Sequence, residues 1–313
     1  MSAPAPTSRL AVELAGLSLQ NPLLLASGTA GYGRELDGVI DIDAFGGLVT
    51  KAVSVEPRSG AAAPRVAEFP GGMLNAVGLA NPGVESVRSE HLPWLAQRMR
   101  RARVLVNVVG NQIEHFAEVV ARLDGVPGFQ AFEINVSCPN VRAGGMEFGA
   151  DPDALRDLVR RARQATALPI FVKLSPAVPD IARTATVALE AGANGLTLVN
   201  TMPGLLVDVE HRRPELGFGS GGMSGPALLP IGVLATWKVH RATRAPIIGV
   251  GGIASATDAI QYLMAGASAF AIGTAALRDP RLPVRLLRDL ASWCEVRGVN
   301  AVGELTGTLE WPS

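Results

Sequence analysis

The 313-residue chain has little of what marks several classes of protein. Only two cysteines are present, Cys138 and Cys294, whereas a disulfide framework needs more, so we expect a protein of the reducing cytoplasm. Its 28 basic residues balance 28 acidic ones, which leaves no net charge to attract nucleic acid or an anionic membrane. No apolar run approaches the length of about 18 residues that a membrane span needs, and residues 1–9 lack the apolar segment of a signal peptide.

Apolar residues, by contrast, are plentiful. Hydrophobic residues make up 48% of the chain and charged residues only 18%, which is enough material for one large core. The length lies within the range of a single α/β barrel. We therefore expect residues 1–313 to form one domain.

Short apolar, β-branched runs alternate with segments of helical periodicity. The eight runs are Leu23–Ser27, Gly47–Val53, Val104–Val109, Ala131–Cys138, Pro169–Ser175, Gly195–Thr201, Pro246–Val250 and Ala269–Thr274. The helical segments include Asp151–Thr166, Asp180–Ala191, Pro226–Arg241 and Ala256–Ala265. Eight alternating units with right-handed crossovers predict an α/β fold of the (β/α)8 TIM-barrel type. An open, doubly wound sheet is the alternative.

Three further segments surround the predicted barrel. Leu10–Leu14 and Leu17–Leu19 alternate around Gly16, which predicts an N-terminal hairpin at one end of the body. Residues 54–82 after the second strand and residues 202–225 after the sixth form long connections without obvious structure. Because both leave the carboxyl ends of strands, where barrel enzymes build their sites, we expect them to be lids or binding loops.

Polar residues recur near the carboxyl ends of the first six predicted strands. The most polar strand, 131–138, places Glu133 and Asn135 on one face, which indicates either a half-exposed edge or the lining of a wet site. Taken singly, a strand-end Lys often reaches solvent and an Asn often caps a turn. Together the six residues predict a donor-rich pocket for a planar, partly anionic ligand. They are Ser27, Lys51, Asn107, Asn135, Lys173 and Asn200.

The last two strands end in glycines. Gly251, Gly252 and Gly273, followed by Thr274, would let backbone N–H groups approach a phosphate at these positions of a barrel. Ser224-Gly225-Pro226 is a third candidate contact. No Gly-x-Gly-x-x-Gly motif stands in a strand-to-helix context, so a mononucleotide such as FMN fits better than a dinucleotide. Lys173 could then lie against the part of a flavin that becomes anionic on reduction.

Cys138 is the candidate for proton transfer. A lone cysteine is more often a small buried filler, but this one ends the most polar strand and precedes a glycine-containing loop. A nucleophilic cysteine normally needs a histidine, and all four histidines fall outside the strand ends. A thiolate acting as general base beside a flavin needs none. Cys294 is expected to be structural, and the histidines lack the spacing of a metal site, so no metal is expected.

The residues resemble the class 1 dihydroorotate dehydrogenases, most closely the class 1B catalytic subunit. Cysteine at position 138 is typical of class 1, and the likeness covers nearly the whole chain. Departures are Ala30, where an aromatic residue is common, and Gly60–Pro64, which lacks a frequent Asn. The matching segments are Asn21-Pro22, Ala26–Gly28, Thr50–Ala52, Glu56–Arg58, Asn75–Gly83, Asn135–Asn140, Val172–Pro176, Asn200–Gly204, Ser224–Pro226, Gly251-Gly252 and Gly273-Thr274.

The resemblance implies oxidation of (S)-dihydroorotate to orotate in pyrimidine synthesis. Cys138 would take the proton from ring carbon 5 while hydride leaves carbon 6 for flavin nitrogen 5. The substrate-binding residues it implies are Lys51, Asn75, Ala76, Val77, Gly78, Leu79, Asn135, Asn200 and Thr201. The FMN-binding residues it implies are Ser27, Lys51, Asn107, Asn135, Lys173, Val199, Gly225, Gly251, Gly252, Gly273 and Thr274.

The resemblance also implies a partner. Class 1B enzymes pair with an electron-transfer subunit that carries FAD and an iron–sulfur cluster and passes electrons to NAD⁺. The expected assembly has two chains of each kind around a homodimer of catalytic subunits. Three alternatives stay open: a class 1A enzyme linked to fumarate, a flavin barrel acting on another pyrimidine, and a non-catalytic barrel that binds a phosphorylated ligand.

Overall fold

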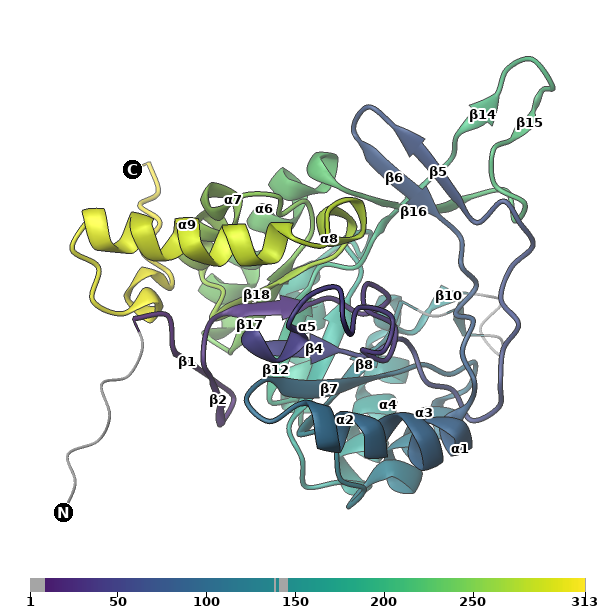
Figure 1. Ribbon diagram of the computed structural model, residues 1–313. Coiled ribbons are helices and arrows are strands. Elements are labelled where there is room, and N and C mark those ends of the chain that lie inside the picture. The colour runs from purple at the N-terminus through teal and green to yellow at the C-terminus, as the bar shows by residue number, and fades with distance from the viewer. Residues whose placement is uncertain (1–8, 138, 141–145, 313) are drawn as a thin grey trace.

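Eight parallel strands close into a barrel in the computed structural model, which describes residues 9–137, 139–140 and 146–312 (Figure 1). Each strand pairs with the next in chain order, and the last pairs with the first. The predicted TIM barrel is confirmed and the open sheet is excluded. The barrel strands are β3 (Leu23–Leu25), β4 (Gly47–Val49), β7 (Arg103–Val108), β8 (Ala131–Asn135), β11 (Ile170–Leu174), β12 (Gly195–Leu198), β17 (Ile247–Val250) and β18 (Ala269–Ile272).

Helices surround the barrel. In the described part of the chain, no helix is both long enough and apolar enough to cross a membrane. The α-helices are α1 (Val84–Ser86), α2 (Leu92–Arg98), α3 (Ile113–Leu123), α4 (Pro152–Gln164), α5 (Ile181–Glu190), α6 (Leu229–Thr243), α7 (Ala256–Ala265), α8 (Thr274–Arg278) and α9 (Leu282–Val296). A π-helical segment, η2 (Val87–His91), joins α1 to α2, and the 3₁₀ turns are η1 (Ile42–Ala44), η4 (Phe148–Ala150), η5 (Pro226–Leu228) and η6 (Val302–Leu305).

The sequence explains these elements locally. The barrel strands are rich in apolar residues because both of their faces are covered, as in β3, where all three leucines are buried. Helix α4 buries Leu155, Leu158 and Val159, one stripe at a spacing of three and four residues, against the barrel. Asp151 caps this helix by accepting from the N–H groups of Asp153 (2.9 Å) and Ala154 (3.3 Å).

Most barrel strands are shorter than the sequence predicts. The predicted strand 131–138 ends at Asn135, because the Asn135 side chain accepts a hydrogen bond from the N–H of Ser137 (3.3 Å) and turns the chain. Likewise β3, β4 and β12 end two residues before Ser27, Lys51 and Asn200. These polar residues therefore stand on the turns that leave the strands.

The predicted N-terminal hairpin is confirmed. Strands β1 (Val12–Leu14) and β2 (Leu17–Leu19) pair antiparallel, and Leu14 and Leu19 are buried. The carbonyl of Ser18 accepts from Nε of Arg103 (3.0 Å), the first residue of β7. The hairpin thus covers the amino ends of the barrel strands.

The two long connections contain strands that the sequence does not make obvious. Strands β5 (Val66–Phe69), β6 (Gly72–Asn75), β13 (Met202–Gly204) and β16 (Gly221–Ser224) form one antiparallel sheet, and β14 (Val207–Asp208) pairs with β15 (Arg213–Pro214). In Figure 1 this sheet and hairpin project from the side opposite β1 and β2. Strands rich in glycine and paired across the two connections give little local signal.

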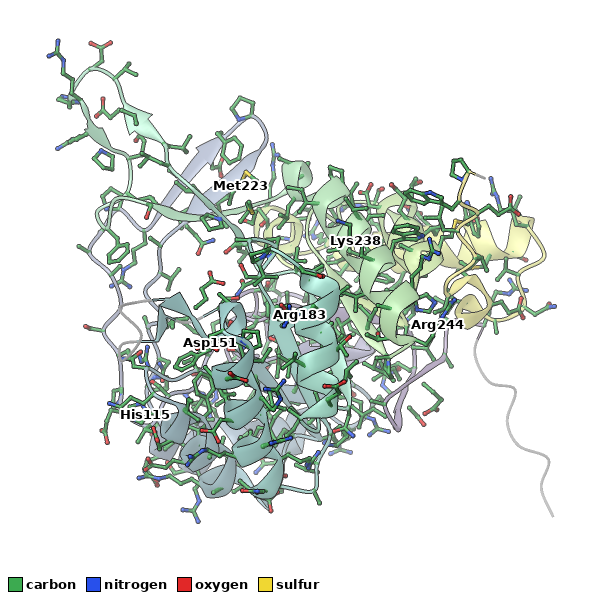
Figure 2. The ribbon with its side chains drawn as sticks, turned by 180° about the vertical axis from the view of Figure 1, so that it is seen from behind. His115, Asp151, Arg183, Met223, Lys238 and Arg244 are labelled. Carbon is green, nitrogen blue, oxygen red and sulfur yellow. The ribbon has the colours of Figure 1, made fainter. Side chains whose placement is uncertain are left out.

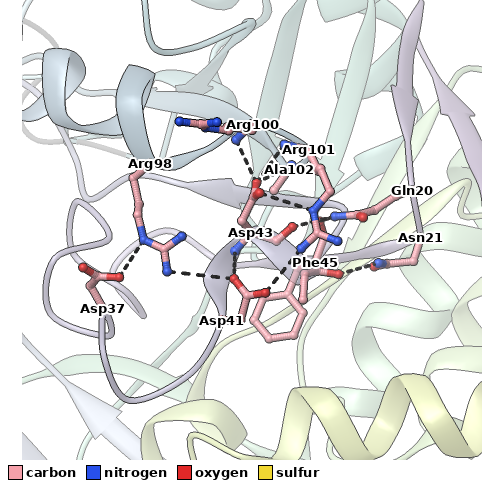
Figure 3. A network of polar contacts seen from close by, with 11 residues as sticks. Gln20, Asn21, Asp37, Asp41, Asp43, Phe45, Arg98, Arg100, Arg101 and Ala102 are labelled. Carbon is pink, nitrogen blue, oxygen red and sulfur yellow. Dashed lines mark hydrogen bonds and ion pairs between the residues drawn. The ribbon is translucent and has the colours of Figure 1, made fainter.

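A polar network joins η1 to the start of β7 at the amino end of the barrel (Figure 3). Oδ1 of Asp43 accepts from the N–H groups of Arg100 (2.9 Å), Arg101 (2.8 Å) and Ala102 (2.9 Å). Burial opposes ionisation of Asp43, but these hydrogen bonds prevail and hold its pKa below the ordinary value. Asp43 therefore holds the turn that feeds β7 into the barrel.

Candidate active site

The six polar residues predicted at the strand ends lie on the carboxyl side of the barrel. Asn107 is fully buried and Lys173 is 7% exposed, whereas the other four are partly exposed. Figure 2 shows Asp151 and Arg183 near the N-terminal ends of α4 and α5, with Met223 of the projecting sheet above them. Because helix N-termini mark the face where the preceding strands end, the sheet stands over that face.

A buried acid connects four of the barrel strands. Glu133 on β8 is 1% exposed and accepts from Nδ2 of Asn107 on β7 (2.6 Å) and from Oγ1 of Thr197 on β12 (2.8 Å). Nζ of Lys173 on β11 lies 3.8 Å from Oε1 of Glu133 and forms an ion pair with it. Sequence reasoning placed Asn107, Glu133 and Lys173 on one side of the strands, and the structure brings them together.

A second cluster joins Asn135 to Asn200. Oδ1 of Asn135 accepts from Nδ2 of Asn200 (3.1 Å) and from the N–H of Ser137 (3.3 Å), while Oδ1 of Asn200 accepts from the N–H of Thr201 (2.9 Å). The Asn135 acceptor is thus occupied, and its Nδ2 group is the one left to a ligand. The cluster offers hydrogen-bond donors, as an anionic ligand requires.

Ser27 and Lys51 line the opposite part of the rim. Oγ of Ser27 donates to the carbonyl of Thr50 (2.8 Å), and the backbone N–H of Lys51 donates to the carbonyl of Gly31 (2.7 Å). The Lys51 side chain is partly exposed, so its ammonium group can meet a ligand carboxylate.

The segment expected to hold the substrate crosses the projecting sheet. Nδ2 of Asn75, at the end of β6, donates to the carbonyl of Gly222 on β16 (3.0 Å). A Cβ added at Gly222 would lie 2.0 Å from Oγ1 of Thr201, so Asn75, Gly222 and Thr201 are neighbours. The chain then turns at Gly78 and at Leu79, which has a left-handed φ of 56°. Ala76 and Val77 are tied to the preceding strand region by hydrogen bonds with Arg65 and Ala61.

In the loops before α6 and after β17, glycines pack so closely against neighbouring backbone that a side chain would not fit. Gly252 has φ +73°, and a Cβ there would lie 2.5 Å from the backbone nitrogen of Leu229 at the start of α6. At Gly225, also left-handed, it would lie 2.7 Å from Cα of Gly72. The hydroxyl of Tyr262 donates to the carbonyl of Gly251 (2.8 Å), and burial raises the pKa of Tyr262 so that it remains a neutral donor.

The end of β18 meets the same loops. Oγ1 of Thr274 donates to Oγ of Ser224 (2.8 Å), so the loops after the sixth and eighth strands are joined. Val199 is buried behind this region. Its N–H donates to the carbonyl of Val250 (2.8 Å), and the peptide bond between Leu198 and Val199 is cis. These loops carry the residues that the sequence predicts to contact a phosphate.

Cys138 lies outside the described residues. Half-buried Glu147, at the start of the next described stretch, hydrogen-bonds with Ser175, which follows β11. Burial raises the pKa of Glu147, and the Ser175 hydrogen bond opposes that shift. Among the described residues no cluster of three His, Cys, Asp or Glu side chains could hold a metal ion, and the absence of a metal stays a prediction.

The polar groups fit a flavin mononucleotide. Oδ1 of Asn107 is buried without a hydrogen-bond partner in the described part of the chain, so this acceptor is available to a donor group of a ligand inside the barrel. Lys51, Lys173 and Asn135 provide donors for ring carbonyls, and the close-packed glycine loops suit a phosphate. Partly anionic, planar, heteroatom-rich ligands match such a donor set.

Sequence reasoning missed two members of the site. Thr197 lies within an apolar strand, where a threonine is a normal strand former, and only its inward position between Leu196 and Leu198 could have marked it. Tyr262 lies on α7 and reaches Gly251 from outside the barrel, which no local pattern indicates.

Comparisons with known proteins agree on one family. The sequence model described as dihydroorotate dehydrogenase matches residues 9–293. The chain is 46% identical over 299 residues to "Dihydroorotate dehydrogenase B (NAD(+)), catalytic subunit" of Desulforudis audaxviator, with 96% of this chain and 97% of the relative covered. Proteins with that name from Pelobacter propionicus (44% over 301 residues, 96% and 98% covered) and Geobacillus kaustophilus (45% over 300 residues, 96% and 95% covered) are also similar.

Proposed function

The chain belongs to the dihydroorotate dehydrogenase family, and from this premise we propose that it oxidises (S)-dihydroorotate to orotate in pyrimidine biosynthesis as a type B, NAD⁺-linked catalytic subunit. The observation that carries the proposal is the donor-rich mouth of the barrel, where Asn200 is hydrogen-bonded to Asn135 and the neighbouring Thr201 lies against Gly222 of the projecting sheet. Dihydroorotate is a small carboxylate with ring amides, and such a mouth matches it.

FMN is the proposed resident cofactor. Bound in the barrel, it would supply hydride acceptance from the substrate. Its ring would be held by Asn107, Asn135, Lys173 and the rim residues Ser27 and Lys51. Its phosphate would be held by the loops that contain Gly225, Gly251, Gly252, Gly273 and Thr274, with Val199 packed behind them.

The substrate is proposed to lie between the FMN site and the projecting sheet. Lys51 would pair with its carboxylate, and the amides of Asn75, Asn135 and Asn200 would bind its ring groups. The segment Ala76–Leu79 and Thr201 would complete the pocket, supported by the contact of Asn75 with Gly222. A pocket that fixes the substrate by several hydrogen bonds also orients ring carbons 5 and 6 for reaction.

Cys138 is the proposed general base. Its thiolate would remove the proton from carbon 5 while carbon 6 loses hydride, and a double bond forms between the two carbons. A thiolate needs no histidine partner for this step. Its place in the sequence, three residues after Asn135, supports the assignment.

We further propose a partner subunit and a homodimer of catalytic chains, with FAD and an iron–sulfur cluster on the partner and two chains of each kind. The names of the relatives, "catalytic subunit" and "NAD(+)", support the partner. Exposed apolar side chains on the projecting hairpin region, Leu205, Val207, Val209 and Phe218, support an interface on the catalytic chain.

The visible spectrum of the purified chain tests the proposal, before and after anaerobic addition of dihydroorotate. We expect a flavin band that bleaches. A flavin band that persists would contradict dihydroorotate as the substrate. The absence of flavin from a folded sample supplied with FMN would favour a non-catalytic phosphate-binding barrel. If the chain acts on another pyrimidine, the flavin band should bleach when that pyrimidine is added instead.

Replacement of Cys138 by Ala tests the base. Because general base catalysis contributes about 10²- to 10⁴-fold, we expect the rate of flavin bleaching to fall by about that factor while FMN stays bound. Cys294→Ala is the matched control, since Cys294 is buried in α9 and should leave the rate unchanged. Equal rates in both variants would remove Cys138 from the mechanism.

A further inference from the structure

Glu133 has the most enclosed charge in the candidate site, and no substrate or cofactor contact is assigned to it. The residue is 1% exposed and meets side chains from three other strands: Asn107, Thr197 and Lys173. A carboxylate is costly to bury unless other groups pair with it. Its burial together with these three side chains therefore indicates a role beyond packing.

The carboxylate fixes the orientation of Asn107. An ionised carboxylate only accepts hydrogen bonds, so Asn107 must turn its Nδ2 group toward Glu133, at 2.6 Å. Oδ1 of Asn107 then faces away, buried and without a partner in the described part of the chain. Glu133 thus determines that Asn107 offers an acceptor, rather than a donor, to whatever fills the barrel.

The carboxylate also offsets the charge of Lys173. The distance of 3.8 Å between Nζ and Oε1 is that of an ion pair and exceeds a hydrogen bond. The ammonium hydrogens therefore stay available to a ligand while part of the positive charge is neutralised. Because the group is shielded from water, these charges act strongly on a neighbouring ligand.

We propose that Glu133 is a positioning residue of the flavin site, which sets the reduction potential of bound FMN through Asn107 and Lys173. The inference rests on the proposed function, since it requires FMN in the barrel. Reduction adds negative charge to the flavin, which Lys173 stabilises and Glu133 opposes. Without Glu133 the potential would rise, and without Lys173 it would fall.

The midpoint potential of FMN in the intact chain, measured against reference dyes without substrate, tests the proposal. Glu133→Gln keeps the shape and removes the charge, and we expect the two-electron reduction equilibrium to shift at least tenfold toward reduced flavin, about 30 mV. Glu133→Asp keeps the charge and should restore most of the wild-type potential. Thr197→Val, which loses a hydrogen bond to Glu133 but no charge, is the matched control and should shift the equilibrium less than threefold.

The double variant Glu133→Gln/Lys173→Met removes both charges, so neither is left buried without its partner, and it keeps the test available if a single variant does not fold. We expect its potential to lie near that of the wild type, because two opposing effects are removed together. A double variant shifted tenfold or more toward oxidised flavin would show that Lys173 acts alone and would overturn the proposal. Wild-type protein that holds no FMN would instead overturn the proposed function itself.

Discussion

At the scale of single residues, the polar side chains of the barrel mouth are oriented by one another. Asn200 illustrates this, since its oxygen accepts from the N–H of Thr201 and its Nδ2 donates to Asn135. Asn135 in turn has its oxygen occupied and its amide hydrogens left for a ligand. The donor character of the pocket therefore depends on residues whose roles include holding a neighbour.

Replacing Asn200 by Asp tests this dependence. The substituted carboxylate would face Oδ1 of Asn135, cancel one donor and add negative charge where an anionic substrate binds. Loss of a hydrogen bond to a charged group costs about 1.5–3 kcal/mol, so we expect KM for dihydroorotate to rise about 10- to 100-fold. Asn300→Asp, at an exposed position, makes the same chemical change elsewhere and should leave KM unchanged. A KM unaffected by Asn200→Asp would contradict the arrangement.

The positions of the site residues could be predicted from the sequence, but their partners could not. Strand alternation places Glu133 and Asn135 on one face, and this holds in β8. The bond between Asn135 and Asn200 spans 65 positions in the chain and depends on barrel closure. Local patterns carry no information on such pairs, so the Glu133 network becomes visible only in three dimensions.

At the scale of elements, the glycine loops proposed to hold the phosphate need backbone segments that pack closely against each other, with no side chain between them. Gly252 combines a left-handed φ of +73° with a Cβ position only 2.5 Å from the Leu229 nitrogen. Gly298 has a similar φ of +68°, yet nothing lies within 4 Å of its Cβ position. Substitution of either glycine has the same conformational cost. Only at Gly252 would the new side chain also collide with α6, the helix that borders the candidate site.

We therefore expect Gly252→Ala and Gly298→Ala to differ in FMN binding. Both substitutions should cost about 1–2 kcal/mol of stability from the left-handed conformation. Gly252→Ala should also displace the loop and weaken FMN at least about tenfold, which corresponds to 1.4 kcal/mol. Fluorescence titration of the apoprotein with FMN measures the difference. Equal FMN affinity in the two variants would show that this loop does not hold the phosphate.

Asp43 fixes the element that leads into β7. Replacing it by Ala leaves three backbone N–H groups without their acceptor, and we expect a loss of about 2–4 kcal/mol in the free energy of unfolding by urea. Asp37→Ala, which breaks a half-exposed ion pair with Arg98, should cost at most about 1 kcal/mol. Similar losses in both variants would contradict the special role of Asp43.

The depressed pKa of Asp43 gives the same prediction a pH dependence. A carboxyl whose pKa is lower in the folded state contributes stability that is complete above its unfolded pKa, near 3.8, and is lost as the pH falls toward the folded value. Unfolding measured from about pH 5 to about pH 3 should therefore show a smaller loss of stability for Asp43→Ala than for the wild type. Parallel curves would assign the acid sensitivity to other groups.

The elements themselves were predictable to different degrees. Eight strands followed from apolar runs because strands buried on both faces need continuous hydrophobic residues. The projecting sheet did not, since β16 is Gly221-Gly222-Met223-Ser224 and gains its structure from pairing with β6, far away in the chain. Glycine-rich strands are specified by their partners rather than by their own propensity.

At the scale of the whole molecule, the chain holds one half of a redox reaction. The proposed sites at the barrel mouth would hold a flavin and a pyrimidine. In the described part of the chain, no Gly-x-Gly-x-x-Gly segment opens a helix after a strand, as a dinucleotide site would require. The sequence Gly217–Gly222 has this glycine spacing, yet it leads into β16. We therefore expect electrons that reach the flavin to leave through the proposed partner subunit.

We expect the isolated chain, given dihydroorotate and NAD⁺ without oxygen, to reduce its flavin once and then stop. No NADH should accumulate until the electron-transfer subunit is added, because the proposed route of electrons from the flavin to NAD⁺ runs through that subunit. A small dye that accepts electrons should restore turnover without the partner, which serves as the control for an active flavin. Continuous NADH formation by the chain alone would contradict the proposed division of labour, and continuous turnover with fumarate would place the chain with the fumarate-linked enzymes.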